Sequence, residues 1–247
     1  EEKVSVHRDE PIFDGQFSNR CYQSAVRQAF HNFAEKAEKQ NRYCHEEDER
    51  LTEQWSRIIM HLPYAFQAKR MFPDIFRHDR EGTEMWDAIA EQLGPMPADH
   101  NSDDPQIIEI WEKAMDGYRR AISKTPEYLD FHASRIEKGQ RASSLIGNQY
   151  TGSIFLALMS TFESDLEENS NLDNTLFGLC GYGSGAKAKV FEGKVSPRWR
   201  EVVSRWHLFE RLAGRIAIDH ITYENLHKGL QDDSVVTPKG EFALVEI

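Results

Sequence analysis

The sequence has 247 residues, of which 39% are hydrophobic and 29% charged, enough for one large domain or two small ones. Its formal net charge of −11 at pH 7 argues against nucleic acid and anionic membranes as general partners. An anionic ligand would need a local basic patch. No apolar run approaches the roughly 20 residues that a membrane span requires, and the start of the chain lacks the basic and apolar regions of a signal peptide.

The cysteines exclude two further classes of protein. Cys21, Cys44 and Cys180 are an odd number, lie far apart and form no CxxC pair, which argues against a disulfide framework and against a zinc cluster. We therefore expect no metal and a reducing, cytoplasmic environment. The chain does not begin with Met and opens on the polar run "EEKVSVHRDEP", so we expect it to be the middle of a longer protein.

The first predicted helix follows the turn signal Asp14-Gly15. It runs from Ser18, a candidate N-cap, to about Lys39. Its apolar residues advance by three or four and form one stripe: Cys21, Tyr22, Ala25, Val26, Ala29, Phe30, Phe33, Ala34 and Ala37. Residues 44–52 form a charged connector.

A buried strand is predicted to end at His61, after the short apolar run Ile58–Met60. Pro63 suits the first turn of a helix, and apolar residues recur at helical spacing as far as Phe76. This edge of an α/β sheet is where ligands bind, and a histidine held there can donate or accept a proton. The alternative is a histidine that only packs or caps.

The rest of the chain continues the alternation of helices and strands. Helices are predicted near 85–93 and over 105–122, with a loop at 94–104 between them. Gly147-Asn148 forms a turn ahead of an apolar helix, a polar loop covers 164–174, and a buried strand covers 176–180. The glycines at 181–185 are followed by an extended segment rather than a helix, which is not the context of a phosphate-binding loop. One or two short helices are expected in 196–230.

Three segments at predicted element junctions carry a resemblance: "MHLPY" at 60–64, "IGNQYTGS" at 146–153 and "CGYGSG" at 180–185. In this order they resemble the 3-hydroxy-3-methylglutaryl-CoA synthases of the thiolase superfamily. The segments "EPIFDGQFSNRCY" and "RLAGRIAIDHITYENLH" are also similar to segments of that family. The resemblance covers nearly the whole chain and is specific as a set, whereas a single motif would not be.

The resemblance implies condensation of acetyl-CoA with acetoacetyl-CoA to give HMG-CoA, without a cofactor beyond the CoA thioesters. His61 matches the catalytic histidine, which would polarise and protonate the ketone oxygen. Asn148 matches the asparagine that binds the acetoacetyl unit. The remaining substrate contacts implied are Tyr150, Gly181, Tyr182 and Ser184, with Lys69 and Arg70 as the cations nearest a CoA phosphate. As alternatives, Asn148 caps the following helix and the glycines only form a hairpin.

Two positions depart from the family pattern. Gly181 replaces the serine that opens the glycine turn, and Phe66 replaces a lysine that many members carry five residues after the histidine. The nucleophilic cysteine and general-base glutamate of the family lie in an N-terminal half that we do not find in this chain. Cys21 lies on a helix stripe, Cys44 in a connector and Cys180 in a buried strand, where a thiol is a poor nucleophile.

The expected fold is therefore α/β: residues 1–247 are the C-terminal half of a thiolase-like αβαβα sandwich, a mixed sheet covered by helices, with a helical insertion at about 78–140. Its expected partner is an N-terminal half, a separate subunit or cleavage product that carries the cysteine and glutamate, within a dimeric enzyme. This chain alone would be inactive. Two other functions stay open: an enzyme of similar chemistry on carrier-protein substrates in polyketide β-branching, and a non-catalytic regulatory subunit.

Overall fold

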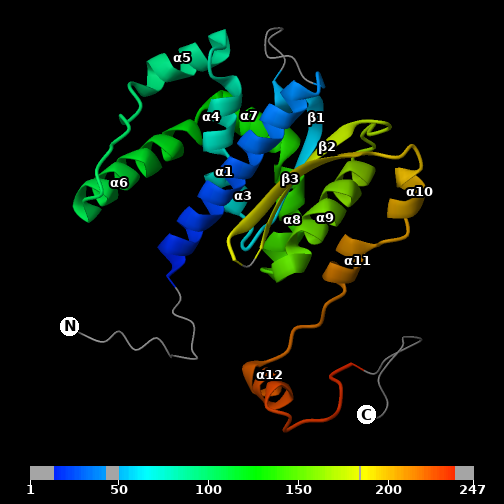
Figure 1. Ribbon diagram of the computed structural model, residues 1–247. Helices are drawn as coiled ribbons and strands as arrows, with labels where there is room; N and C mark the ends of the chain where they lie inside the picture. The colour runs from blue at the N-terminus through cyan, green and yellow to red at the C-terminus, as the bar shows by residue number, and fades with distance from the viewer. Residues whose placement is uncertain (1–13, 43–49, 184, 237–247) are drawn as a thin grey trace, which may run out of the picture. The chain divides into compact units, whose positions relative to one another are not determined.

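The computed structural model describes residues 14–42, 50–183 and 185–236, and the chain divides into two compact units, Glu1–Phe209 and Glu210–Ile247. The first unit is a mixed α/β structure around a small sheet (Figure 1). Its strands are β1 (Trp55–Met60), β2 (Leu176–Gly183) and β3 (Lys187–Lys194). The helices nearest the sheet are α1 (Gly15–Lys39), α2 (Leu51–Gln54), α3 (Gln67–Met71), α4 (Pro73–Arg80), α8 (Glu137–Ile146) and α9 (Ser153–Glu167).

The sheet is mixed, in the order β1-β2-β3. β1 pairs with β2 in parallel, with Met60 opposite Cys180, and β2 pairs with β3 in an antiparallel hairpin. The parallel pair requires a long crossover between its two strands, and residues 61–175 supply it. Because the two strands run in the same direction, the end of β1 and the end of β2 meet at one edge of the sheet.

One face of the sheet is covered by α1. Asp14 caps this helix by accepting hydrogen bonds from the Gln16 and Phe17 amides at 2.9 and 3.0 Å. The buried side of α1 places Phe30 edge-on to the Trp55 ring, 6.0 Å between centroids. Gly178, on the neighbouring strand, leaves room for this indole, because a Cβ at Gly178 would lie 2.1 Å from Trp55 Cε3.

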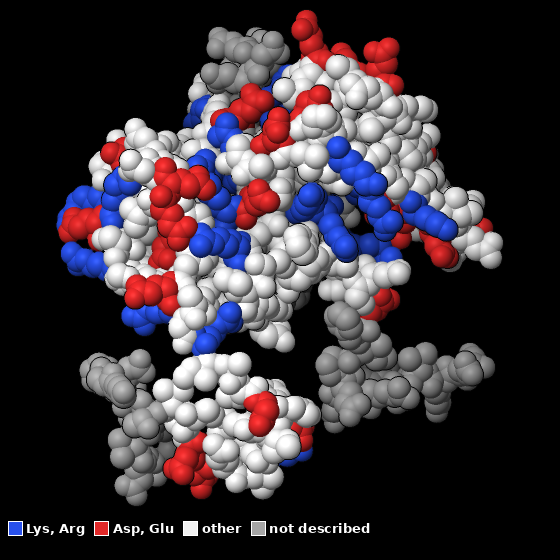
Figure 2. Space-filling view, turned by 180° about the vertical axis from the view of Figure 1, so that it is seen from behind, with Lys and Arg blue, Asp and Glu red and all other residues white. Residues whose placement is uncertain are grey.

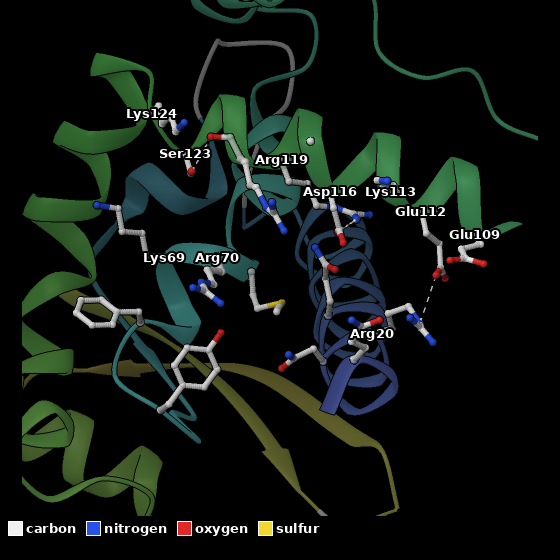
Figure 3. A pocket seen from close by; sticks show the side chains of 18 residues that line it. Arg20, Lys69, Arg70, Glu109, Glu112, Lys113, Asp116, Arg119, Ser123 and Lys124 are labelled. Atoms are coloured by element: carbon white, nitrogen blue, oxygen red, sulfur yellow. Dashed lines mark hydrogen bonds and ion pairs between the residues drawn. The ribbon is translucent and has the colours of Figure 1, made fainter. Parts of the chain in front are cut away.

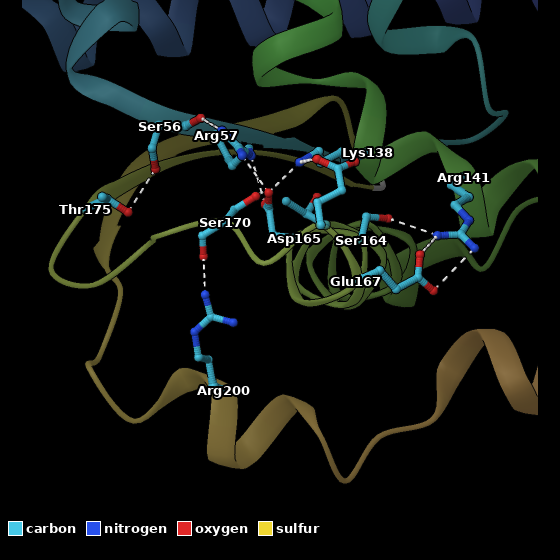
Figure 4. Close-up of polar contacts among 12 residues, drawn as sticks. Ser56, Arg57, Lys138, Arg141, Ser164, Asp165, Glu167, Ser170, Thr175 and Arg200 are labelled. Carbon is cyan, nitrogen blue, oxygen red and sulfur yellow. Dashed lines mark hydrogen bonds and ion pairs between the residues drawn. The ribbon is translucent and has the colours of Figure 1, made fainter.

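The opposite face is covered by α9, where Phe162 stacks on Phe177 with 5.0 Å between centroids. An ion cluster fastens the end of this helix to the start of β1 (Figure 4). The fully buried Asp165 accepts hydrogen bonds from Arg57 at 2.5 and 2.8 Å and from Lys138 at 2.5 Å. Burial alone would raise the pKa of this carboxyl, but the hydrogen bonds from Arg57 and Lys138 outweigh it and hold the pKa below its ordinary value.

Helices occupy most of 78–140, the range predicted as a helical insertion. They are α5 (Glu84–Leu93), α6 (Pro105–Ile122) and α7 (Pro126–Arg135), before α8. Thr83, Asp104 and Thr125 accept amide hydrogen bonds as their N-caps. Three short helices follow the hairpin: α10 (Trp199–Val203), α11 (Leu208–Ala213) and α12 (His220–His227). Within the described ranges, no helix is both long and apolar enough to cross a membrane.

Three sequence expectations differ from the structure, and a fourth falls mostly outside the described residues. Asp14, not Ser18, caps α1, so the helix begins at Gly15. The helix expected from Pro63 begins only at Gln67, and Pro73 starts a second helix because its ring cannot continue the first. α9 reaches Glu167, into the expected loop. Residues 43–49, most of the expected connector, lie outside the described ranges.

We expect Gly178→Ala to destabilise the protein by about 3 kcal/mol or more, because the new methyl group would overlap the Trp55 ring inside a packed core. Urea unfolding measures the loss. Gly183→Ala on the same strand is the matched control, since a Cβ there has nothing within 4 Å. Equal stability of the two variants would contradict the close approach of Gly178 to Trp55.

Candidate functional site

His61 follows the last residue of β1 and is 8% exposed. Its amide donates a hydrogen bond to the Cys180 carbonyl at 3.0 Å, which continues the parallel pairing by one residue. The His61 backbone is therefore fixed by the sheet. The prediction of a histidine at the end of a buried strand is confirmed.

Tyr22 of α1 holds His61 from the other side. Its hydroxyl donates a hydrogen bond to the His61 carbonyl at 2.8 Å, and its ring lies 6.3 Å from the imidazole and 4.7 Å from the Tyr182 ring. Burial raises the pKa of the Tyr22 phenol well above its ordinary value, so the hydroxyl remains a donor. Burial also lowers the pKa of His61 below 6.5, so the imidazole is neutral at pH 7 and retains one N–H donor.

Tyr182 completes an aromatic group around His61, with 6.2 Å between the two ring centroids. Gly181 lies beside it, and a Cβ there would be 3.8 Å from Ile154 Cδ1 at the start of α9. The structure thus brings Gly181, Tyr182 and His61 to one edge of the sheet. Ser184 lies outside the described residues.

Asn148 precedes α9, whose Ile154 Cδ1 lies 3.8 Å from the Cβ position of Gly181. Its Oδ1 accepts hydrogen bonds from the Tyr150 amide at 2.7 Å and the Ser153 hydroxyl at 3.2 Å. The side chain thus stabilises the turn before α9, but it does not cap that helix, whose N-cap is Gly152. Its Nδ2 has no hydrogen-bond partner within the described residues and stays available to a ligand. No hydrogen bond or ion pair joins Asn148 to His61 among those residues.

Tyr150 stands out in this turn. It is 78% exposed and has a φ of 48°, a left-handed conformation that a bulky residue rarely adopts. Phe155, one turn into α9, is 63% exposed. Large aromatic side chains held in solvent beside a candidate site are typical of a surface that binds another molecule.

Lys69 and Arg70 belong to a different part of the site. They line a cleft of about 1130 Å³ between α1, the 64–71 segment and α6 (Figure 3). The cleft reaches Tyr64, three residues after His61, and its Tyr64 ring lies 5.7 Å from the Arg70 guanidinium. The opposite wall of the cleft is formed by α6. The sequence patterns did not identify any side chain of α6 as a site residue.

Cys180, one of the two cysteines among the described residues, lacks the setting of a nucleophile. Cys180 is fully buried, and burial raises the pKa of its thiol to about 12, which leaves almost no thiolate at neutral pH. Cys21 is half-buried on α1, next to Tyr22. Cys44 lies outside the described residues.

Solved structures share this fold. The structure titled "MvaS in complex with 3-hydroxy-3-methylglutaryl coenzyme A" aligns with a TM-score of 0.66 at 24% identity, over 94% of this chain and 48% of that one. PksG, an HMG-CoA synthase from Bacillus subtilis, aligns with a TM-score of 0.59 at 17% identity, over 92% of this chain and 43% of that one. The fold is that of the thiolase-like HMG synthases.

The family model of the hydroxymethylglutaryl-coenzyme A synthase C terminal matches residues 3–233, and this chain belongs to that family. The Haloferax volcanii hydroxymethylglutaryl-CoA synthase is 24% identical, over 94% of this chain and 51% of the relative. The Saccharomyces cerevisiae synthase is 21% identical, over 87% of this chain and 41% of the relative. The chain thus spans about half the length of these relatives or less.

Sequence reasoning missed two parts of the site. Tyr22 was identified only as a member of an apolar stripe, because its contact with His61 joins residues 39 apart in sequence. The α6 wall of the cleft carries charges that look like an ordinary solvated helix face. No local sequence signal identifies Tyr22 or the α6 wall as part of the site, although Tyr22 falls within the family-like segment "FSNRCY".

We expect the His61 imidazole to titrate below pH 6.5, because burial disfavours the charged ring. The proton it gains on acidification then opposes folding, so this histidine contributes a loss of stability as the pH falls below 6.5. Histidine NMR signals followed against pH measure the pKa, with His61→Asn to assign the resonance. An apparent pKa at or above 6.5 would show that the ring is solvated or paired with an anion.

Tyr22→Phe should lower the free energy of unfolding by about 1 kcal/mol, because the His61 carbonyl loses a buried hydrogen bond. It should also move the His61 pKa, since the ring's surroundings change. Chemical denaturation and NMR titration measure the two effects. Tyr118→Phe is the control, because this mostly buried phenol forms no hydrogen bond within the described residues. If His61 has the same pKa in the unsubstituted protein and in both variants, Tyr22 does not shape the surroundings of the His61 ring.

Proposed function

We propose that this chain is the C-terminal part of an enzyme that condenses acetyl-CoA with acetoacetyl-CoA to HMG-CoA. The observation that carries the proposal is the neutral, buried His61 at the shared end of β1 and β2, beside Tyr182 and the start of α9. Membership of the HMG-CoA synthase family supports it.

In the proposed reaction, an acetyl group is first carried as a thioester on a cysteine, and a glutamate removes a proton from its methyl carbon. That carbon then forms a bond with the ketone carbon of acetoacetyl-CoA. Negative charge develops on the ketone oxygen, where the N–H of His61 stabilises it by a hydrogen bond, and the oxygen takes up the proton that the glutamate removed from the methyl carbon. Asn148 Nδ2 would bind the acetoacetyl unit, and water releases the product from the cysteine.

The cysteine and glutamate come, in this proposal, from an N-terminal half of the enzyme. Cys180 is unsuitable because its thiol is buried and protonated, and this chain covers only about half of the relatives' length. The exposed Tyr150 and Phe155 beside the site fit a surface that the other half covers. Denaturing mass analysis of the purified protein, after incubation with acetyl-CoA, would identify the acetylated polypeptide. Acetylation of a cysteine of this chain would overturn the arrangement.

Carrier-protein substrates are the second candidate, because the chain also shares its fold with a Curacin pathway HMG synthase solved in complex with an acetyl donor-ACP. That match has a TM-score of 0.59 at 18% identity. The catalytic step at His61 would be the same with either carrier. The surfaces that bind the non-reacting part of the substrate would therefore decide between CoA thioesters and carrier-protein substrates.

In the assembled enzyme, His61→Ala should leave acetyl transfer to the cysteine largely intact and lower the rate of condensation by about 100-fold or more, the usual range for loss of a hydrogen-bond donor to a developing oxyanion. Rapid-quench measurement of acetyl-enzyme and of HMG-CoA separates the two steps. Asn148→Ala is the companion variant, expected to raise the KM for acetoacetyl-CoA more than it changes acetyl transfer. An equal loss of both steps in His61→Ala would contradict the assigned role.

A further inference from the structure

We propose that His31 of α1 and His78 of α4 form an acid-sensitive contact between the two helices. At neutral pH the two uncharged rings lie against each other, and on acidification they become charged and repel. α1 then separates from α4, and the cleft between α1 and α6 loses its fixed width. This device goes beyond the proposed function and does not depend on it.

The two rings meet where the helices face each other. Their centroids lie 3.9 Å apart with an interplanar angle of 50°, and both residues are half-buried. Two neutral imidazoles can pack at this distance, whereas two imidazolium ions at the same distance repel each other. The contact between His31 and His78 is therefore compatible with only one charge state of the pair.

The histidine pair lies at the end of a row of polar contacts between the two helices. Asp74 of α4 lies one turn before His78. It accepts a hydrogen bond from Gln23 Nε2 at 3.3 Å and forms an ion pair with Arg27 at 3.8 Å. Gln23, Arg27 and His31 are four residues apart in sequence, so they follow one side of α1. Charge, and not only apolar packing, therefore decides how this side of α1 is held.

The surroundings of the pair keep both rings uncharged at pH 7. Burial is the main cause that lowers the pKa of His31 and of His78 below 6.5. For His31, the neighbouring His78 ring and then Arg27 act in the same direction. The charged groups that act on one ring or the other are Arg27 and Glu35 of α1, and Arg77, Asp79 and Glu81 of α4.

The carboxylates near the pair do not neutralise two new charges. Glu35 and Glu81 are exposed, and each pairs with a basic residue one turn away on its own helix. Asp79 is buried and accepts hydrogen bonds from α2. Glu81 Oε2 also lies 3.7 Å from His78 Nδ1, so the first proton goes to His78. A second proton, on His31, then meets a charged ring beside it.

The other helices packed against α4 use their titratable groups elsewhere. Glu53 of α2 and Asp116 of α6 each pair with an arginine. Tyr118 of α6 is a phenol whose pKa is raised by burial, so it carries no charge at neutral or acidic pH. The basic residues of α3 line the cleft, and the buried residues of α5 are apolar.

The contact between α1 and α4 bears on the cleft because Asp74 also binds α6. This carboxylate is 1% exposed and accepts a hydrogen bond from Arg119 Nε at 2.8 Å, so α1, α4 and α6 meet at one residue. The cleft of about 1130 Å³ lies between α1 and α6, and Lys and Arg side chains gather around a hollow on the side of the molecule where α6 lies (Figure 2). A shift of α1 away from α4 therefore changes the distance between the walls of the cleft.

Urea unfolding at about pH 7.5 and about pH 5.5 tests the titration of the pair. A histidine whose pKa is lower in the folded chain than in the unfolded chain binds its proton mainly on unfolding, so stability is lost as the pH falls below 6.5. Each such proton lowers the folding equilibrium constant by up to about tenfold per pH unit. The double variant H31Q/H78Q should therefore lose less stability than the unsubstituted protein. His220→Gln, which removes an exposed histidine of α12, is the control and should lose as much as the unsubstituted protein.

Hydrogen exchange at the same two pH values, corrected for the intrinsic rates, tests the separation of the helices. In the unsubstituted protein, the amides of α1 and α4 should lose about tenfold or more of their protection relative to those of β2. In H31Q/H78Q that relative loss should disappear. By NMR, the pKa of His31 should rise in the single variant His78→Gln, because a neighbour that opposes its charge is removed.

Three results would each overturn the inference. One is an equal loss of stability on acidification in H31Q/H78Q and in the unsubstituted protein. Another is a uniform loss of protection across α1, α4 and β2, which would show global destabilisation without separation of the two helices. The third is an unchanged pKa of His31 in His78→Gln. The exchange measurement on the unsubstituted protein decides the question even if a variant fails to fold.

Discussion

Parallel pairing of β1 with β2 is the constraint on which the rest of the structure depends. Two parallel strands need a crossover, and its last helix, α9, leads back to the sheet with its end fastened to Arg57 through Asp165. The start of α9 is thereby placed beside Gly181. Three segments distant in sequence, ending at His61, at Tyr182 and at the turn before α9, reach the same edge for this one geometric reason.

The environment of His61 follows from the packing of α1 on this edge. Tyr22 is both an apolar surface against Tyr182 and a hydrogen-bond donor to the His61 carbonyl. The same packing removes water from the imidazole and lowers its pKa. A neutral ring at pH 7 suits a group that stabilises a developing oxyanion through its N–H, and burial achieves this without a charged neighbour.

Sequence patterns predicted the local features of the site and failed where tertiary contact decides. The apolar run before His61 and the glycines after Cys180 have local signatures, so the strand end and the hairpin were predicted correctly. The cap of α1 was misplaced because Ser18 and Asp14 are both good N-caps, and the sequence alone does not decide between them. Tyr22 forms a hydrogen bond with His61, and α6 lies across the cleft from Arg70. Both features depend on how distant helices pack, which the periodicity of the sequence does not predict.

The distribution of charge separates the two ends of the proposed substrate site. Around His61 the neighbours are aromatic and uncharged, which favours a reaction that develops charge on a small acyl group. Cations are concentrated in the cleft beyond Tyr64, partly on α6, a helix in the range expected as an insertion.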